Sequence, residues 1–553
     1  MLVHLNTTTG AVNTTHVLVK LRKPLSVTQT SGVIPITQSR AVSALCKLRD
    51  AMRSRIFLLG ALAFTCLGQD SSTPQVPVTT FQSATRLVVL DVVVTDKQGK
   101  PVSNLSKDDF TIVEDGTQQT VASFEPPDQH APVTVEAHRE KEISRPENAP
   151  QKIGAEPLTI LVFDALDTKI LDQAYARHEI KKYLVARGPL LAQPTALMAL
   201  EEKRLELLHD YTRDAGELQD ALQGYRAELP FRMMADEGMR LGAHERSEDA
   251  IAALREIATS NTQFAGRKNV VWIGQGFPSL NNLRGSPAQK ARVQNWGRET
   301  LDLISQARMS VYTIDPRGLQ VFPEEVLPPT TSELALESIT LLTGGRIVRG
   351  LNDVDAQIAS SIENGGTYYA ISYYPSNRNW DGQFRRVRVV IRNPDFVART
   401  RAGYFAYAES TPTYAQLDTL LSRALVNPLP YHALNIEAQA KLSGSQTRTA
   451  HMHVTLDASG LHWQIVPDER HRCEITLVAA GFSSAGKVVT NAAQEFEITV
   501  DEKKYAELMN KGMVMNLVMR IPPTAVRMRV VTRDSTNGNI GTADLTPEGQ
   551  QFH

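Results

Sequence analysis

The feature that most constrains the fold of this chain is a set of apolar runs without polar alternation. The first is Leu158–Asp164, and residues 269–274 and 310–315 have the same character. A run of this kind suits a parallel strand that is buried on both faces of a sheet. Two of the three runs end in a carboxylate, Asp164 or Asp315.

Helical patterns separate these runs. Apolar residues recur at helical spacing over 171–187 and 215–222, Ser247 is placed to cap another helix, and a last strand pair is predicted at 368–374 and 386–391. Strands that alternate with helices imply βαβ crossovers. We therefore predict a doubly wound, mostly parallel, Rossmann-like α/β sheet over residues 157–408, with ligands gathering at the carboxyl ends of its strands.

Composition changes mark the flanking regions. Short β-branched runs around turn residues predict a small β module at 82–126, and prolines with scattered charges mark a linker at 127–156. A second linker with a short helix is expected at 409–435. Alternating strands with turn signals then predict a β-sandwich-like domain at 436–548, interrupted by a helix at 502–511.

An export signal is predicted late in the sequence. Residues 52–68 combine a basic start with an apolar core too short to span a membrane, and cleavage is expected before Gln69. Residues 69–81 are then a tether, and residues 1–51 a non-native or disordered extension. Lipidation of Cys66 is the alternative to cleavage. The mature protein is expected to be periplasmic, outer-envelope-associated or extracellular, with no transmembrane helix.

Charge and cysteine content exclude other classes. Lys plus Arg number 59 against 60 Asp plus Glu, which argues against a nucleic-acid partner. The 3 cysteines lack the paired spacings of zinc or redox sites. If the signal is cleaved, Cys473 alone remains, and a single thiol suits an oxidising compartment when a strand buries it.

Three landmarks occur in the order known from one family. Asp164-Ala165-Leu166-Asp167-Thr168 follows the first strand, Thr212 precedes a helix, and Gln275 follows the strand at 269–274. The chain resembles von Willebrand factor A domains, whose Asp-x-Ser-x-Ser motif, threonine and second aspartate occupy these places. With residues 373–375, 381–386 and 403–406 it also resembles the related secreted proteins of acidobacteria.

The resemblance implies a site for Mg²⁺ or Mn²⁺, which prefer oxygen ligands near octahedral geometry. Asp164, Thr168 and Thr212 match the family pattern, whereas Leu166 replaces a serine and Gln275 replaces an aspartate. We therefore predict a degenerate metal site and no bound cofactor. Weak binding of the ion, with Asp167 supplying the missing carboxylate, is the alternative.

The expected function is exported protein binding or adhesion, with an unknown protein partner in the envelope or outside the cell. No Gly-x-Ser-x-Gly elbow is present in the sequence, and no other catalytic motif stands out, so an enzyme is not expected. Two alternatives remain open. One is a metal-assisted hydrolase that uses Asp164, Asp167 or Asp315, and the other is a structural envelope component without a specific ligand.

Overall fold

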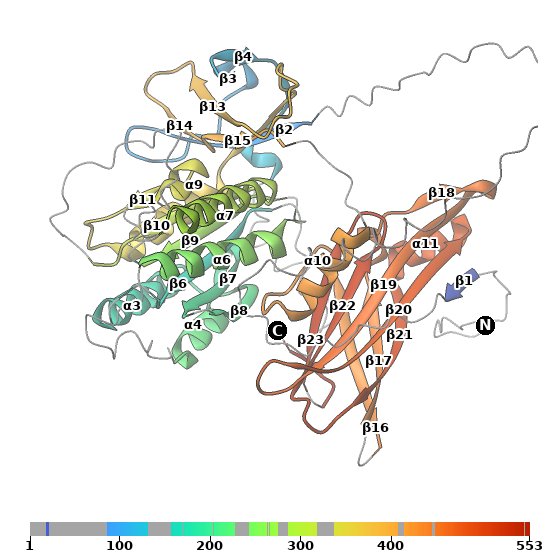
Figure 1. The fold of residues 1–553 in the computed structure, drawn as a ribbon. Coiled ribbons are helices and arrows are strands. Elements are labelled where there is room, and N and C mark those ends of the chain that lie inside the picture. Colours follow the sequence, from blue (N-terminus) through green and yellow to red (C-terminus); the bar gives the residue numbers. More distant parts are fainter. Residues whose placement is uncertain are drawn as a thin grey trace, which may run out of the picture. The chain divides into compact units, whose positions relative to one another are not determined.

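A computed structural model gives the structure of the chain (Figure 1). It describes residues 18–21, 86–130, 156–166, 168, 170–202, 204–226, 243–262, 264, 266–274, 286–317, 337–407, 414–444, 448–546 and 548–552. The predicted signal peptide at 52–68, with Cys66, and the tether at 69–81 lie outside these residues, as does most of the linker at 127–156. Within the described ranges, no helix is long and apolar enough to cross a membrane.

One mixed sheet forms around the apolar runs. Its strand order is β11-β10-β9-β6-β7-β8, and every neighbouring pair is parallel except the antiparallel pair of β7 and β8. The strands are β6 (Leu158–Asp164), β7 (Leu190–Glu201), β8 (Arg204–Asp214), β9 (Lys268–Ile273), β10 (Met309–Ile314) and β11 (Ile347–Val348). We call residues 156–366 the mixed-sheet domain.

Helices pack on both faces of this sheet (Figure 1). Successive residues of β6 serve opposite faces: Ile160 and Val162 belong to one core cluster, Leu161 and Phe163 to the other. The first cluster includes residues of α6 (Ala243–Asn261), α7 (Pro287–Gln306) and α8 (Glu337–Leu342); the second includes residues of α3 (Ile170–Ala186), α4 (Ala215–Gly224) and α9 (Val354–Gly366). The helix predicted to start at Ser247 begins earlier, at Ala243.

The predicted fold class is wrong. Four of the five sheets in the described residues are antiparallel, and the mixed sheet, with its antiparallel β8, is not a doubly wound parallel sheet. An apolar run shows that a strand is buried, but it does not show which strand lies beside it. The prediction therefore missed that β8 and the strand pair predicted at 368–374 and 386–391 form antiparallel ladders.

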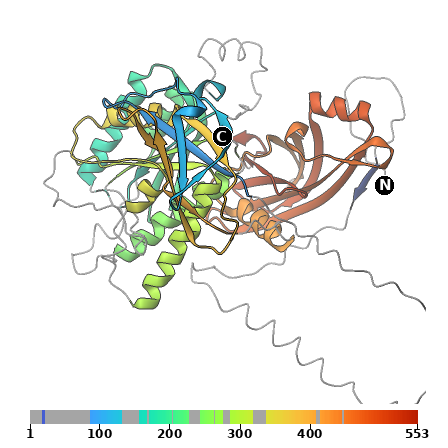
Figure 2. The ribbon, with the colours of Figure 1, turned by 90° about the horizontal axis from the view of Figure 1, so that it is seen from above.

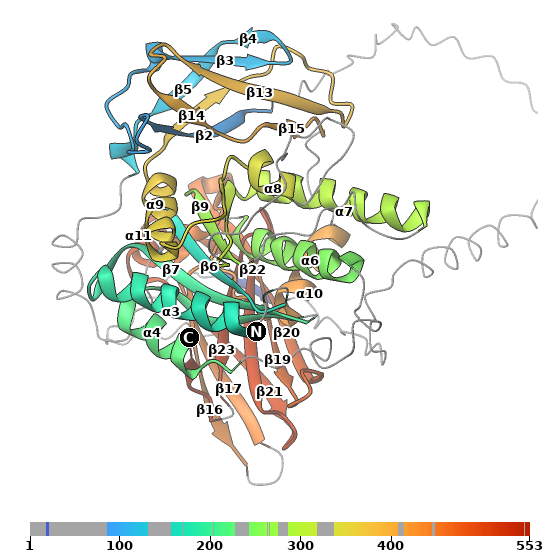
Figure 3. The same ribbon diagram turned by 90° about the vertical axis from the view of Figure 1, so that its left-hand side faces the viewer.

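Strands from before and after the mixed-sheet domain form one β module. Two four-stranded antiparallel sheets, ordered β14-β2-β12-β5 and β15-β13-β3-β4, share a core that includes Leu90, Ile112, Tyr369 and Val387. Figures 2 and 3 show its early strands in blue beside its late strands in gold. The strands are β2 (Val88–Thr95), β3 (Phe110–Glu114), β4 (Thr117–Gln119), β5 (Val121–Glu125), β12 (Tyr369–Tyr373), β13 (Phe384–Ile391), β14 (Val397–Arg399) and β15 (Gly403–Phe405).

We call residues 86–130 and 367–407 the split β module, because the mixed-sheet domain is inserted between its two parts. The predicted boundaries, 82–126 and 157–408, assigned the second part to the α/β domain. The register contradicts that assignment: Ile371 of β12 lies opposite both Leu90 of β2 and Phe124 of β5. These partners are more than 240 residues away along the chain, so no local pattern could reveal them.

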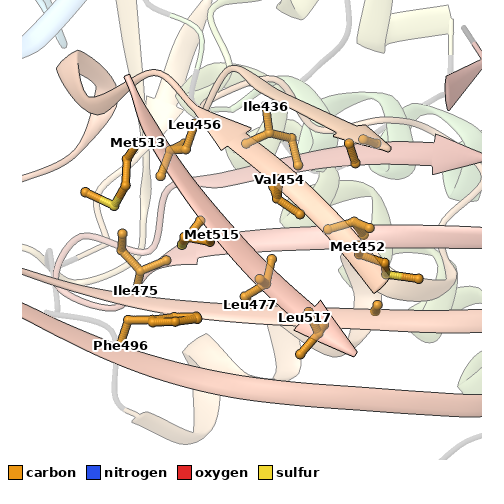
Figure 4. Packing of buried hydrophobic residues seen from close by; sticks show 14 of the residues in the cluster. Ile436, Met452, Val454, Leu456, Ile475, Leu477, Phe496, Met513, Met515 and Leu517 are labelled. Carbon is orange, nitrogen blue, oxygen red and sulfur yellow. The ribbon is translucent and has the colours of Figure 1, made fainter. Parts of the chain in front are cut away.

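The C-terminal region is a sandwich of a three-stranded and a seven-stranded antiparallel sheet, with β1 (Leu18–Leu21) at the edge of the larger one. Side chains of both sheets, such as Met515 and Leu477, meet in one core (Figure 4). Its other strands are β16 (Ile436–Ser443), β17 (Arg448–Leu456), β18 (Gln464–Val466), β19 (Arg470–Phe482), β20 (Val488–Val500), β21 (Met513–Ile521), β22 (Arg527–Asp534), β23 (Ile540–Leu545) and β24 (Gln551–Phe552).

One sequence expectation for this sandwich is confirmed. The helix predicted at 502–511 is α11 (Glu502–Lys511), which Asp501 caps by accepting a hydrogen bond from the Lys504 N–H at 2.8 Å. Cys473 lies on β19 and is 1% exposed. Burial raises the pKa of its thiol, which therefore stays protonated and unreactive.

Candidate functional site

The carboxyl ends of the parallel strands form the candidate site. Asp164 is the last residue of β6, Gly274 follows β9, and Asp315 follows β10. Because these strands are parallel neighbours, their carboxyl ends meet at one edge of the sheet. Both aspartates are 2% exposed, so each carboxylate needs partners to replace the water that it has lost.

An indole and a backbone amide hold the carboxylate of Asp164. Its Oδ1 accepts a hydrogen bond from the Leu166 N–H at 3.0 Å, and its Oδ2 accepts one from Trp272 Nε1 at 3.0 Å. Trp272 lies on β9 opposite Val162 and is fully buried. The indole thus ties the end of β6 to β9 through a directional bond within the core.

Gly274 is required by this arrangement. A Cβ atom on Gly274 would lie 2.5 Å from the Cβ of Asp164, a distance that real side chains do not adopt. The main chain after β9 therefore passes directly against Asp164. In the sequence this glycine is visible only as a bend after a strand, and its steric reason appears once the two strands lie side by side.

The loop after β6 is fixed to the first helix of the domain. Gln173 on α3 donates hydrogen bonds from Nε2 to the carbonyl oxygens of Ala165 at 3.0 Å and Thr168 at 2.7 Å. The Thr168 side chain is fully buried, and its Oγ1 has no hydrogen-bond partner among the described residues. A buried hydroxyl of this kind can still accept or donate a hydrogen bond, or ligate an ion.

Thr212 lies far from Asp164. It pairs with Thr195, which pairs with Thr159 at the start of β6, whereas Asp164 pairs with Leu200. Five residues of strand at about 3.3 Å each place the two sites roughly 16 Å apart along the sheet. The sequence-based grouping of Thr212 with Asp164 is therefore contradicted, because β8 runs antiparallel and ends at the opposite edge.

Thr212 instead belongs to the start of α4. Its Oγ1 donates to Glu217 Oε2 at 2.6 Å and accepts from the Asp214 N–H at 3.0 Å. Asp214 caps the helix by accepting from the N–H groups of Gly216 and Glu217. Thr212, Asp214 and Glu217 therefore form the hydrogen-bonded N-terminus of α4.

The described residues do not complete a site for Mg²⁺ or Mn²⁺. Such an ion needs about six oxygen ligands. Asp164 and Thr168 lie close in sequence at the correct edge. The Asp164 carboxylate oxygens, however, already accept hydrogen bonds from N–H groups. Asp167 and Gln275 lie outside the described residues. Across the described ranges no three His, Cys, Asp or Glu side chains are placed to hold a metal ion. A metal role for Asp164 and Thr168 stays a prediction.

Two further buried carboxylates, Glu201 and Asp315, lie at this edge, and of these only Glu201 was not recognised from the sequence. Glu201, at the end of β7, is 4% exposed and accepts hydrogen bonds from Tyr225 Oη at 2.8 Å and Arg204 Nη2 at 2.5 Å. Burial and the Glu201 carboxylate raise the pKa of Tyr225. Asp315, a candidate of the hydrolase alternative, accepts from Arg317 Nε at 2.9 Å and Nη2 at 2.6 Å.

No protein-family model matches the chain, and no curated protein matches its sequence. Among solved structures, the VWA domain of SpRpn10 is 14% identical, over 29% of this chain and 89% of that domain, with a TM-score of 0.15. The pilus adhesin SpaC from Lactobacillus rhamnosus GG is 9% identical, over 72% of this chain and 54% of the adhesin, with a TM-score of 0.24.

A β-glucuronidase from glycoside hydrolase family 2 is 13% identical, over 20% of this chain and 11% of that enzyme, with a TM-score of 0.15. The chain thus spans only a small part of the glucuronidase and about half of the adhesin. At TM-scores this low the similarities carry no argument about function.

Proposed function

We propose that the protein is an exported binding module that presents the loops at the carboxyl edge of its mixed sheet to a protein partner. The observation that carries the proposal is the fixed geometry of this edge. Trp272 and the Leu166 N–H orient Asp164, and Gln173 on α3 donates hydrogen bonds to the Ala165 and Thr168 carbonyl oxygens. A loop whose conformation is set before binding loses less entropy when a partner orders it.

Export is proposed from the signal-peptide pattern at 52–68. The extracytoplasmic location, the adhesion-type role and the acidobacterial relationship belong to the same proposal. They follow from the sequence patterns, and the geometry of the edge is compatible with them.

Binding is proposed to proceed without a divalent ion, because both Asp164 carboxylate oxygens accept hydrogen bonds from N–H groups and a leucine and a glutamine replace two of the oxygen ligands of the family pattern. Titration calorimetry of Mg²⁺ and Mn²⁺ into the full chain tests this point. We expect no saturable heat for the wild type or for Asp164→Asn. Saturable binding in the wild type that Asp164→Asn removes would show a working metal site.

Partner binding is tested by immobilising the purified chain and recovering proteins from an envelope extract, with and without EDTA. The Gln173→Ala variant removes the hydrogen bonds to the Ala165 and Thr168 carbonyl oxygens and should recover at least about fivefold less of a specific partner. Gln439→Ala, an exposed change on β16, is the matched control and should recover as much as the wild type. Equal recovery by both variants contradicts a role for the edge.

A further inference from the structure

A groove of about 680 Å³ lies where the mixed-sheet domain meets the split β module. Its walls come from α8 and β11 of the mixed-sheet domain and from β13 and β14 of the split β module. No Asp or Glu lines it among the described residues, whereas four arginines do: Arg346, Arg349, Arg388 and Arg399. We call it the arginine groove. The formal net charge of the whole chain is -1, so this concentration of positive charge is local.

Main-chain contacts between the two regions hold the walls of the groove together. The Ala402 N–H, shortly after β14, donates a hydrogen bond to the Leu342 carbonyl oxygen of α8 at 2.9 Å. Gly344 has a φ of +81°, and a Cβ atom on it would lie 2.6 Å from the carbonyl carbon of Thr400. The two main chains therefore touch beside the groove. Walls fixed in this way need little reordering when a ligand binds.

Three of these guanidinium groups have no acidic partner among the described residues. Arg346 Nη2 donates a hydrogen bond to Gln357 Oε1 at 2.9 Å, and this partner is a neutral amide. Arg388 and Arg399 form no ion pair within the described ranges. Burial and the like charge of Arg399 lower the pKa of Arg346, although its guanidinium stays charged in water at ordinary pH. The positive charges of Arg346 and Arg399 therefore repel each other.

A groove with these charges favours an anionic ligand. A cleft lined by charges of one sign concentrates ions of the opposite sign. A guanidinium binds a carboxylate or a phosphate through two parallel hydrogen bonds, each about twice as strong as one between neutral groups. An anion between Arg346 and Arg399 would also offset their repulsion. Because the groove has four guanidinium groups, the ligand that fits it carries several negative charges.

The strands that line the groove favour a peptide among such ligands. Within the described residues, β11 is the last strand of the mixed sheet, and β14 is the last strand of one sheet of the split β module. A strand at the edge of a sheet has backbone N–H and C=O groups with which an extended peptide can pair. Alternate side chains of an extended peptide lie on one face, so acidic residues at every second position can reach the arginines together. A glycan matches the charge but cannot extend a sheet.

We propose that the arginine groove binds an extended acidic peptide segment of a partner protein, in which Asp or Glu alternates with other residues. Ile347 of β11 and Ala398 of β14 both line the groove, so the peptide would lie along these strands while its carboxylates pair with the arginines. β10 and β9 separate β11 from β6, so the groove is distinct from the loop that follows Asp164. The inference does not rest on the proposed function.

Titration calorimetry of the full chain with two capped octapeptides tests the proposal. One peptide alternates glutamate with threonine, and the other has glutamine in place of each glutamate. The acidic peptide should bind with saturable heat. The neutral peptide should bind at least about tenfold more weakly, because it offers no charge to the guanidinium groups. Equal affinity for the two peptides, or no binding of either, overturns the proposal.

Charge-removing variants locate the binding. Arg346→Gln and Arg399→Gln should each weaken binding of the acidic peptide at least about fivefold, and the double variant at least about twentyfold. Arg520→Gln is the matched control, because it removes the same charge from an exposed position on β21, outside the groove. It should bind the peptide as the wild type does. Wild-type affinity in the double variant, or an equal loss in Arg520→Gln, contradicts binding in the groove.

An acidic glycan is the other ligand whose carboxylates match the arginines. Tetragalacturonate is the probe for it, because it carries as many carboxylates as the acidic peptide carries glutamates but has no backbone amides. The peptide should bind at least about tenfold more tightly than the glycan, since only the peptide can pair with an edge strand. Tetragalacturonate that binds as tightly as the peptide, or more tightly, in the wild type but not in the double variant would assign the groove to glycans and overturn the peptide proposal.

Discussion

Two buried carboxylates in different regions of the molecule have different hydrogen-bond donors in place of the water that burial removes. Glu114, in the core of the split β module, and Asp164, at the edge of the mixed sheet, are each 2% exposed. Glu114 accepts hydrogen bonds from Tyr373 Oη at 2.6 Å and Tyr404 Oη at 2.9 Å, and Arg385 Nη1 lies 3.4 Å away. Burial and the Glu114 carboxylate raise the pKa of both tyrosines.

Asp164 accepts hydrogen bonds from two neutral donors among the described residues, an indole N–H and a backbone N–H. The Glu114 carboxylate therefore has a structural role, whereas the Asp164 carboxylate has an orienting role. Glu114 and Arg385 neutralise each other and join strands from the two parts of the split β module. Asp164 instead fixes the direction of a loop at the edge where partners are proposed to bind.

The largest effect should come from removing the cation beside Glu114. Arg385→Leu leaves a buried carboxylate without its guanidinium and should lower the free energy of unfolding by about 3–5 kcal/mol. Denaturant titration measures this. Arg388→Leu, an exposed change on the same strand, should stay within about 0.5 kcal/mol of the wild type. A small loss for Arg385→Leu would mean that the phenols alone support Glu114.

A smaller loss is expected where the main chain passes Asp164. Gly274→Ala places a methyl group 2.5 Å from the Asp164 Cβ and should cost about 2–3 kcal/mol, because backbone must move. Gly297→Ala is the control: it lies in α7 with open space around it, and should stabilise by up to about 1 kcal/mol. Thermal unfolding of both variants measures the contrast, and a neutral Gly274→Ala would disprove the close approach.

The smallest loss is expected from deleting one neutral donor. Trp272→Phe removes the N–H to Asp164 Oδ2 and should lower the free energy of unfolding by about 1–2 kcal/mol. Tyr404→Phe removes one of two phenols from Glu114 and provides the comparison in the other region. If adding Mn²⁺ restores the stability of Trp272→Phe but leaves the wild type unchanged, the indole occupies the place of an ion. If the wild type also gains stability from Mn²⁺, the metal-independent proposal fails.

Local pattern predicted the parts of the fold that depend on burial along one strand. The apolar run ending in Asp164 is β6 with the predicted bounds, and the patterns at 171–187 and 215–222 are α3 and α4 within a few residues. The predictions that failed depend on the direction of a strand and on which strands pair. The β7–β8 hairpin reverses the direction of the chain. Thr212 therefore lies at the opposite edge of the sheet from Asp164, although the sequence predicted the same edge.

The partners of Asp164 and Glu114 could not be predicted for a related reason. Trp272 is 108 residues from Asp164, and Tyr373, Arg385 and Tyr404 are 259 to 290 residues from Glu114. A tryptophan in an apolar strand and tyrosines in alternating strands have no local feature that marks a buried acid opposite them. Such pairs become visible only when strand register is known.

The insertion of the mixed-sheet domain into the split β module affects which part of the molecule a pulling force acts on first. The two ends of that module lie side by side, where Arg86 Nη1 donates to the Tyr407 carbonyl oxygen at 3.0 Å. Inside the module, β5 and β12, which precede and follow the inserted domain, are paired strands. Tension applied along the chain from outside residues 86 and 407 therefore acts first on the β module. The hydrogen bonds that Asp164 accepts from Leu166 and Trp272 would then be kept until those strands part.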